Sequence, residues 1–138
     1  RPPRSTQGVS SAASDVYKRQ THTITDADTA VALRSGEVPV LGTPRLVALI
    51  EEATVKALDG SLADGETSVG MRIHVDHVAP SAPGAGVTAE AVLERVEGRR
   101  LTFGASATVG DAVVATATII RVVVETQRFL DRVDVDAT

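Results

Sequence analysis

The sequence predicts an α+β fold in which one long helix packs on a curved antiparallel sheet. Apolar residues recur at helical spacing over residues 43–58, and from Thr67 onward they alternate with polar ones in four stretches separated by short turns. Strands joined by short turns are antiparallel neighbours, because a parallel pair needs a long crossover. One helix covers only part of such a sheet, so we expect a second copy of the chain to complete it as a homodimer.

The long helix is expected to start at Thr43 and to end at Gly60. Thr43 is a favourable N-cap, and Pro44 suits the first helical position. The predicted buried stripe contains Leu46, Val47, Leu49, Ile50, Ala53, Thr54, Ala57 and Leu58. On the same helical wheel Glu52 points to solvent, whereas Glu51 lies at the margin of the stripe.

The strands are expected in the second half of the chain. In the first of them, the predicted apolar face contains Val69, Met71, Ile73 and Val75 and continues to His77. Gly70 in this strand indicates a β-bulge or the close approach of another backbone. Three further strands are predicted around 87–93, 101–107 and 112–125, with turns at 97–99 and 109–111.

The N-terminal part divides into an arm and two short elements. Residues 1–20 lack an apolar period and are rich in Ser, Pro and basic residues, so we predict a disordered arm. Its end, 15–20, resembles a translated sequencing adapter. A short edge strand is expected at 21–24, and an Asp-capped helical turn or two from Asp26 to Ser35, ended by Gly36. The folded domain is thus predicted at 21–130, followed by an acidic tail at 131–138.

Composition argues against several classes of function. Aromatic residues make up only 2% of the 138 residues and the net charge is −4, which disfavours nucleic-acid binding. The chain has no cysteine, so disulfides and thiolate metal sites are excluded. It also lacks an apolar run of the length that spans a membrane, and we expect a cytoplasmic protein.

Three polar residues lie at or beside positions where the patterns predict apolar ones, namely Thr43, Glu51 and His77. Each has a structural explanation, as an N-cap, as a residue at the helix margin and as a satisfied core histidine. A hydroxyl, a carboxylate and an imidazole are also the groups that nucleophilic and acid–base catalysis require. The N–H of Gly70 is a candidate oxyanion donor.

Other polar clusters give weaker signals. His74 and His77 lie on opposite faces of a strand, so no metal site is expected there. Arg99 and Arg100 follow a hairpin turn, where they are either ordinary solvated charges or ligands of a nucleotide phosphate.

Three segments, 38–53, 65–80 and 96–103, together resemble the fluoroacetyl-CoA thioesterase-like family. The resemblance extends from about 21 to 130 with compatible order and spacing. It implies the hotdog fold, a dimer, and catalytic roles for Thr43, Glu51 and His77, with Gly70 in the active site.

The resemblance further implies that the protein hydrolyses a short-chain acyl-CoA to the acid and free CoA without a cofactor. Two routes remain open: Thr43 attacks the thioester carbonyl with assistance from Glu51, or Glu51 activates a water molecule held by Thr43. In both routes His77 acts as acid–base toward the leaving thiolate, and the Gly70 N–H holds the oxyanion.

Two departures from the family pattern bear on the substrate. Glu37 occupies the position of a gating Phe in the fluoroacetate-specific enzymes, so fluoroacetyl-CoA is not the predicted substrate. Ile119 and Ile120 replace a His and a Glu in the last strand. If these isoleucines fill the acyl pocket, the alternative is a non-catalytic acyl-CoA or small-ligand binding module.

A third hypothesis is a hydratase, but the sequence lacks the Asp/His arrangement that a hydratase requires.

Overall fold

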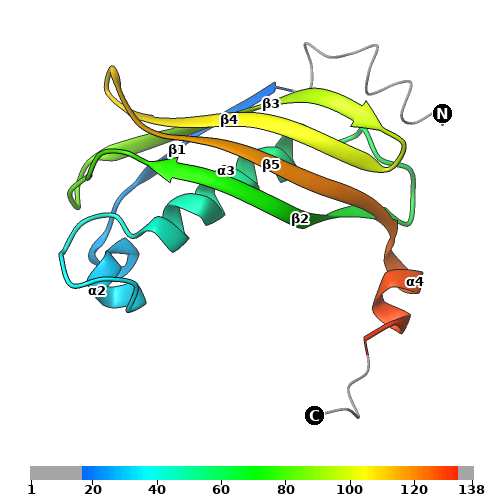
Figure 1. Ribbon diagram of the computed structural model, residues 1–138, viewed down its shortest axis with the longest axis horizontal. Helices are drawn as coiled ribbons and strands as arrows, with labels where there is room; N and C mark the ends of the chain where they lie inside the picture. Colours follow the sequence, from blue (N-terminus) through cyan, green and yellow to red (C-terminus); the bar gives the residue numbers. More distant parts are fainter. Residues whose placement is uncertain (1–16, 134–138) are drawn as a thin grey trace.

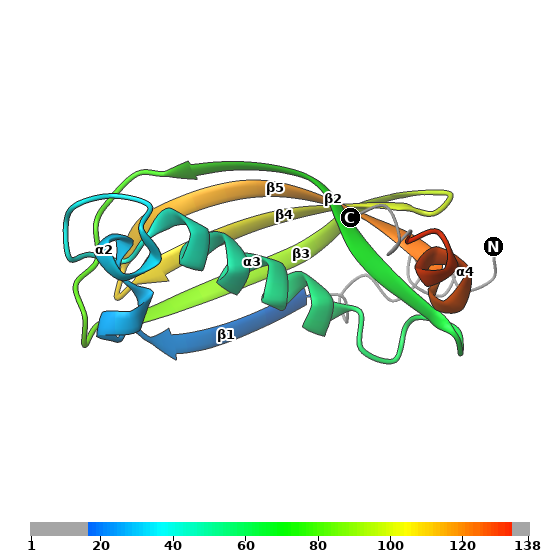
Figure 2. The ribbon, with the colours of Figure 1, turned by 90° about the horizontal axis from the view of Figure 1, so that it is seen from below.

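The computed structural model describes residues 17–133, in which a five-stranded antiparallel sheet curves around one long helix (Figure 1, Figure 2). The strands are β1 (Tyr17–Thr23), β2 (Glu66–His77), β3 (Gly86–Glu97), β4 (Arg100–Val109) and β5 (Ala112–Glu125). Their order across the sheet is β1-β3-β4-β5-β2. The helical elements are η2 (Asp26–Asp28), α2 (Ala30–Leu33), α3 (Thr43–Ala57) and α4 (Thr126–Asp131). The predicted α+β fold is confirmed.

Helix α3 lies across the inner face of the sheet and packs mainly against β3 and β1 (Figure 2). Leu46 and Ile50 on the helix and Phe103 on β4 are completely buried. Each such side chain contributes about 1.5–3 kcal/mol through removal from water. The predicted stripe is buried except for Val47, which is half-buried. Because α3 sits over β3 and β1, it leaves the inner face along β2 less covered.

The start of α3 differs from the prediction by one residue. Gly42 is the N-cap, with extended backbone, and its carbonyl accepts a hydrogen bond from the Leu46 N–H at 3.0 Å. Thr43 is therefore the first helical residue and Pro44 the second. The prediction that Thr43 caps the helix was wrong, and its hydroxyl is available for another partner.

A β-bulge in β2 changes which side chains share a face. The pairing of β2 with β5 shifts by one residue between Gly70 and Arg72, as the glycine indicated. Gly70 lies opposite Arg121, and Ile73 lies opposite Ile119. Because those two β5 residues are two apart, Gly70 and Ile73 share one face. The bulge therefore contradicts the predicted alternation through Val69, Met71, Ile73 and Val75.

Strand β1 begins earlier than predicted, at Tyr17, so the last four residues of the expected arm belong to the sheet. Backbone pairing with β3 holds them there, and Gln20 also donates to the Leu49 carbonyl at 3.3 Å and to Glu52 at 3.1 Å on α3. Such contacts leave no apolar period in the sequence. The rest of the arm, 1–16, lies outside the described residues, as does the end of the acidic tail, 134–138.

The short helices also have bounds that the sequence did not reveal. The turn preceding α2 is capped by Thr25 rather than Asp26. Helix α2 ends at Leu33, and its C-cap is Arg34, at φ 61°, rather than Gly36. Helix α4 was not predicted, because six residues are too few for a helical period. Glu125 caps it by accepting the Arg128 N–H at 2.7 Å. Within 17–133, no helix has the length and apolar character that crossing a bilayer requires.

Candidate functional site

The first residue of α3 and the last residue of β2 meet at one end of the sheet. Thr43 Oγ1 lies 2.7 Å from His77 Nδ1. Two backbone hydrogen bonds fix the approach to Thr43: Gly42 N–H donates to the Asp28 carbonyl at 2.9 Å, and Leu41 N–H to the Ser81 carbonyl at 2.8 Å. The other ring nitrogen of His77, Nε2, is buried and has no hydrogen-bond partner within the described residues. A hydroxyl bonded to an imidazole is an arrangement suited to nucleophilic or acid–base chemistry.

Thr43 and His77 line a cavity of about 330 Å³. Its other walls are mostly small or aliphatic and include Ala30, Val38, Val40, Leu41, Val78, Ala79 and Pro80. Glu37 is exposed and does not line it. The cavity therefore offers a short apolar group a place beside the hydroxyl, without an aromatic lid from this part of the chain.

A second group forms further along the same two elements, where Glu51 of α3 faces the bulge of β2. Glu51 Oε2 lies 3.5 Å from Arg121 Nη1. A Cβ built on Gly70 would stand only 2.7 Å from the same Glu51 oxygen, so the glycine leaves room for the carboxylate. Glu51 is half-buried, as its place at the stripe margin predicted.

Arg121 is the residue of this group that sequence reasoning did not assign to the site. Its side chain is 8% exposed and donates to Ser68 Oγ at 2.8 Å and to the Ser68 carbonyl at 3.0 Å. Burial lowers the pKa of Arg121, and the charge of Glu51 opposes that shift. The available signal was a lone arginine in the inward phase of an otherwise apolar strand.

The structure thus brings the predicted residues together as two pairs, Thr43 with His77 and Glu51 with Gly70. Thr43 and Glu51 are eight residues apart on α3, about 12 Å along its axis. No hydrogen bond joins the two pairs within residues 17–133. The catalytic roles of these four residues remain predictions.

A charged cluster behind the site supports the loop that carries Thr43. Buried Asp28 accepts from Thr25 N–H at 2.8 Å and contacts His22 Nε2 at 2.8 Å and Arg45 Nε at 3.0 Å. Burial alone would raise the pKa of Asp28, but the hydrogen bonds from Thr25 and His22 outweigh it and hold the pKa below its ordinary value. Since the Asp28 carbonyl also binds Gly42, this cluster anchors the residue before Thr43.

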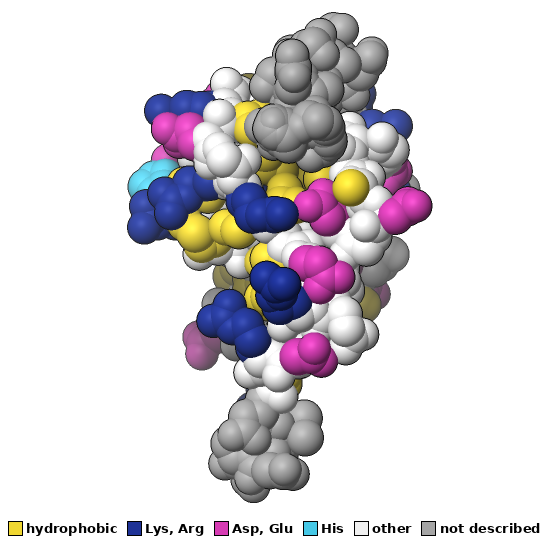
Figure 3. All heavy atoms as spheres, turned by 90° about the vertical axis from the view of Figure 1, so that its right-hand side faces the viewer, with side chains coloured by type: hydrophobic (Ala, Val, Ile, Leu, Met, Phe, Trp, Pro, Cys, Tyr) yellow, Lys and Arg dark blue, Asp and Glu magenta, His cyan; other side chains and the backbone are white. Residues whose placement is uncertain are grey.

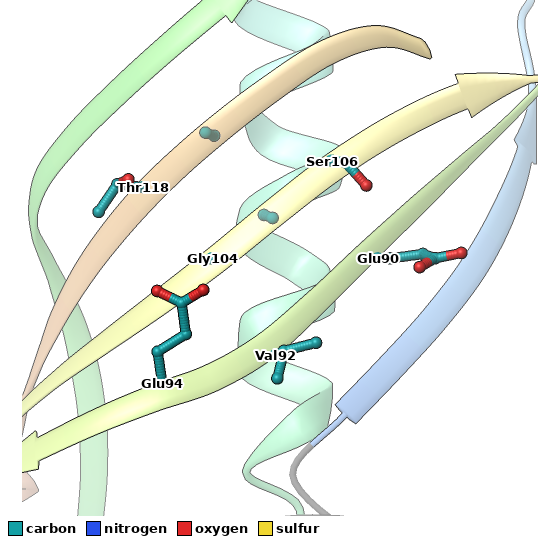
Figure 4. A pocket seen from close by; sticks show the side chains of 8 residues that line it. Glu90, Val92, Glu94, Gly104, Ser106 and Thr118 are labelled. Carbon is teal, nitrogen blue, oxygen red and sulfur yellow. The ribbon is translucent and has the colours of Figure 1, made fainter. Parts of the chain in front are cut away.

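Within residues 17–133, neither acidic and histidine side chains nor the outer sheet face adds a metal centre or a second copy of this site. No group of His, Asp and Glu side chains in the described part of the chain is arranged to hold a metal ion. A cavity of about 370 Å³ lies on the sheet face turned away from α3 and is lined by Glu90, Glu94, Ser106 and Thr118 (Figure 4). It contains none of the four predicted site residues.

Known proteins share this fold and sequence. The family model described as fluoroacetyl-CoA-specific thioesterase matches residues 24–127. The fluoroacetyl-CoA thioesterase of Streptantibioticus cattleyicolor is 40% identical over 90 residues, which are 65% of this chain and 65% of that protein.

Solved structures agree with that match. The fluoroacetyl-CoA thioesterase FlK superimposes with a TM-score of 0.80 at 31% identity, covering 84% of this chain and 90% of that one. A hot-dog-like protein from Thermanaerovibrio acidaminovorans gives a TM-score of 0.78 at 32% identity, covering 84% and 86%.

The helix wrapped by the sheet, and the relatives that share it, place the chain among the hotdog-fold thioesterases. Within that class it belongs to the fluoroacetyl-CoA-specific thioesterase family. The fold and the family predicted from the sequence are both confirmed.

Proposed function

We propose that this protein hydrolyses short-chain acyl-CoA thioesters to the carboxylic acid and free CoA. The observation that carries the proposal is the 2.7 Å contact between Thr43 Oγ1 and His77 Nδ1 at the wall of a small aliphatic cavity, in a member of a thioesterase family. Mutants of the relative FlK have been solved with acetyl-CoA and with fluoroacetate and CoA, which supports an acyl-CoA substrate.

The contact between Thr43 and His77 favours the nucleophile route. Thr43 Oγ1 attacks the thioester carbonyl while its proton passes to His77 Nδ1, and the imidazolium returns a proton to the departing CoA thiolate. Water then cleaves the acyl–threonine ester: Glu51 accepts a proton from the water, Gly70 N–H stabilises the oxyanion, and Thr43 Oγ1 takes up that proton as its bond to the acyl carbon breaks. Because the Glu51 group lies about 12 Å from Thr43 along α3, this step requires that the second copy in the proposed homodimer, or a movement of the acyl group, bring the ester and a Glu51 carboxylate together. Products are the acid, free CoA and regenerated Thr43.

The alternative route uses Glu51 to activate water directly, with Thr43 only holding that water. The two routes differ in one intermediate. Mass spectrometry of wild type quenched during turnover would show the acyl mass on Thr43 in the nucleophile route and no adduct in the water route.

The non-catalytic binding hypothesis requires the isoleucines of β5 to block the acyl pocket. Ile119 is fully buried in the core, opposite Ile73 and Phe103, and neither Ile119 nor Ile120 lines the cavity beside Thr43. The cavity therefore stays open to a short acyl group, which supports turnover over binding alone.

The proposal also covers assembly, location and cofactors. Strand β2 is an edge of the sheet, and Met71 and Ile73 on it are 41% and 39% exposed, which supports pairing with a second copy as a homodimer.

We place the protein in the cytoplasm, where acyl-CoA thioesters are used. It needs no cofactor in this scheme, because water and the named side chains supply every proton transfer.

The test is thiol release from acyl-CoAs of two to eight carbons, measured with a thiol-trapping dye. We expect activity on the shorter chains and a loss of about 100-fold or more in His77→Ala and Thr43→Ala. His74→Ala is the matched control, because His74 lies on the same strand with its side chain 78% exposed. A wild type that binds an acyl-CoA without releasing thiol would overturn the proposal in favour of the binding module.

A further inference from the structure

Arg45 is a cation at a position that helix preferences do not explain. It is the third residue of α3, close to the positive end of the helix dipole, where a positive side chain lowers helix stability. At the α4 end of the molecule, Lys and Arg side chains stand on the surface around hydrophobic ones (Figure 3). At the other end, beside α2, Arg45 instead meets the buried carboxylate of Asp28. The proposed hydrolysis assigns no role to Arg45.

The carboxylate of Asp28 offers Arg45 a fixed partner. Arg45 Nε lies 3.0 Å from Asp28 Oδ1 and is enclosed by the protein, although the side chain as a whole is half-buried. Nε makes no aligned hydrogen bond within the described residues, so the contact is an ion pair. The other oxygen, Oδ2, accepts from Thr25 N–H at 2.8 Å and from the Thr25 hydroxyl at 3.2 Å, and it lies 2.8 Å from His22 Nε2.

Asp28 holds the chain on both sides of Thr43. Its carbonyl accepts the N–H of Gly42, one residue before Thr43, at 2.9 Å, and its carboxylate pairs with Arg45, two residues after Thr43. The backbone before Thr43 also packs closely on α2, because a Cβ on Gly42 would stand 3.1 Å from the Cα of Ala30. The first turn of α3 is thus tied to a single residue by a main-chain contact and a side-chain contact.

The same turn carries the contact on which the proposed hydrolysis depends. The hydroxyl of Thr43 lies 2.7 Å from Nδ1 of His77, which belongs to a different element, β2. A movement of the hydroxyl by about 1 Å would break this hydrogen bond. The ion pair of Arg45 resists such a movement, because it fixes the turn on the far side of Thr43 from Gly42.

We propose that Arg45, held by Asp28, is a positioning residue that keeps the Thr43 hydroxyl within reach of His77. Arg45 does not line the cavity beside Thr43, so it acts through the helical turn and not through contact with an acyl group. The inference rests on the proposed function, since it identifies what maintains the geometry of that site.

The experiment compares Arg45→Met, which keeps a long side chain without the guanidinium, with Arg45→Lys, which keeps the charge. In Arg45→Met we expect kcat for thiol release from acyl-CoA to fall about tenfold or more, with KM within about twofold, because the hydroxyl is misplaced. Arg45→Lys should recover kcat to within about threefold of wild type, because an ammonium also pairs with the carboxylate. Lys56→Met is the matched control and should behave as wild type, since Lys56 is an exposed cation on the same helix, 3.8 Å from Glu52.

A second background separates positioning from a general loss of stability. In Thr43→Ala, the further change Arg45→Met should leave the residual kcat within about twofold, because no hydroxyl remains to be placed. An equal loss of kcat in both backgrounds would overturn the inference. Thermal unfolding checks that each variant is folded at the assay temperature. If Arg45→Met is not, Arg45→Gln takes its place, because glutamine keeps an N–H donor without the charge.

A readout without turnover distinguishes this inference from the proposed hydrolysis. The NMR signals of the two ring nitrogens of His77, assigned with His77→Ala, should show Nδ1 as a hydrogen-bond acceptor in wild type and in Arg45→Lys but not in Arg45→Met. Unchanged signals in Arg45→Met would overturn the inference, and hydrolysis by wild type would then leave the proposed function standing alone. If wild type hydrolyses no acyl-CoA but the signals change as expected, the proposed function fails and the positioning role stands.

Discussion

The hydroxyl of Thr43 and Nδ1 of His77, 2.7 Å apart, join the start of α3 to the end of β2. When Nδ1 accepts the hydrogen bond from the hydroxyl, the neutral imidazole carries its own proton on Nε2. That nitrogen is buried and has no partner among the described residues. The pair thus orients the ring, with Nδ1 toward the hydroxyl and Nε2 enclosed by the protein.

Thr43→Ser should keep kcat/KM within about tenfold, because serine supplies the same hydroxyl to His77. Thr43→Val, which keeps the shape but removes the hydroxyl, should lose about 100-fold or more. Steady-state thiol release gives both values. An active valine variant would show that the hydroxyl has no chemical role.

Gly70→Ala should reduce kcat by about 10- to 100-fold, because its Cβ would stand 2.7 Å from Glu51 Oε2 and must displace the carboxylate. Gly104→Ala is the matched control. Its Cβ would meet the carboxylate of exposed Glu94 on the other face of the sheet, which is free to swing into solvent (Figure 4). Kinetics and thermal unfolding of both variants check the prediction; equal activity in the two would mean that Glu51 has no catalytic role.

Arg121→Met should lower the free energy of unfolding by about 1–3 kcal/mol, because it leaves two half-buried acceptors on Ser68 without their donors. It should also reduce kcat, since Glu51 loses its neighbouring positive charge. Ser68→Ala removes only one of these hydrogen bonds and should retain activity. Urea unfolding and kinetics of Arg121→Met, Glu51→Gln and the double variant measure the coupling; strictly additive losses in kcat would show that the ion pair has no role in turnover.

Asp28→Asn should destabilise the protein most at neutral pH. The pKa of Asp28 is held below its ordinary value, so the charged form adds stability above about pH 4, and this is lost as pH falls through the lowered pKa. The stability difference from wild type, about 1–3 kcal/mol at pH 7, should therefore shrink in acid. Denaturant unfolding from pH 7 to pH 3 tests it. A difference that does not change with pH would show that the charge of Asp28 is not what stabilises the loop before Thr43.

Ile73→Lys should shift the proposed dimer toward monomer, because it puts a charge on the exposed apolar part of the β2 edge. Sedimentation velocity over a range of concentrations measures the change. Val113→Lys, which adds the same charge at a 51% exposed position on β5, is the control and should leave the sedimentation of wild type unchanged. An unaltered dimer in Ile73→Lys would place the interface elsewhere.

The sequence by itself determined the elements whose side chains follow a regular period. The buried stripe of α3, the strands β3 to β5 and the glycine turns between them were predictable, because burial repeats every 3.6 or every 2 residues. Residue identity also indicated the family and singled out Thr43, Glu51, Gly70 and His77.

Only the tertiary structure decided what depends on contacts between distant segments. The bulge after Gly70 reverses the phase of half a strand, which no alternation pattern reveals. Antiparallel pairing with β3 extends β1 back to Tyr17. The pairing of Glu51 with Arg121 joins residues 70 positions apart. These features arise from packing in three dimensions. There a single hydrogen bond, or one extra residue in a strand, outweighs the local conformational preference of the sequence.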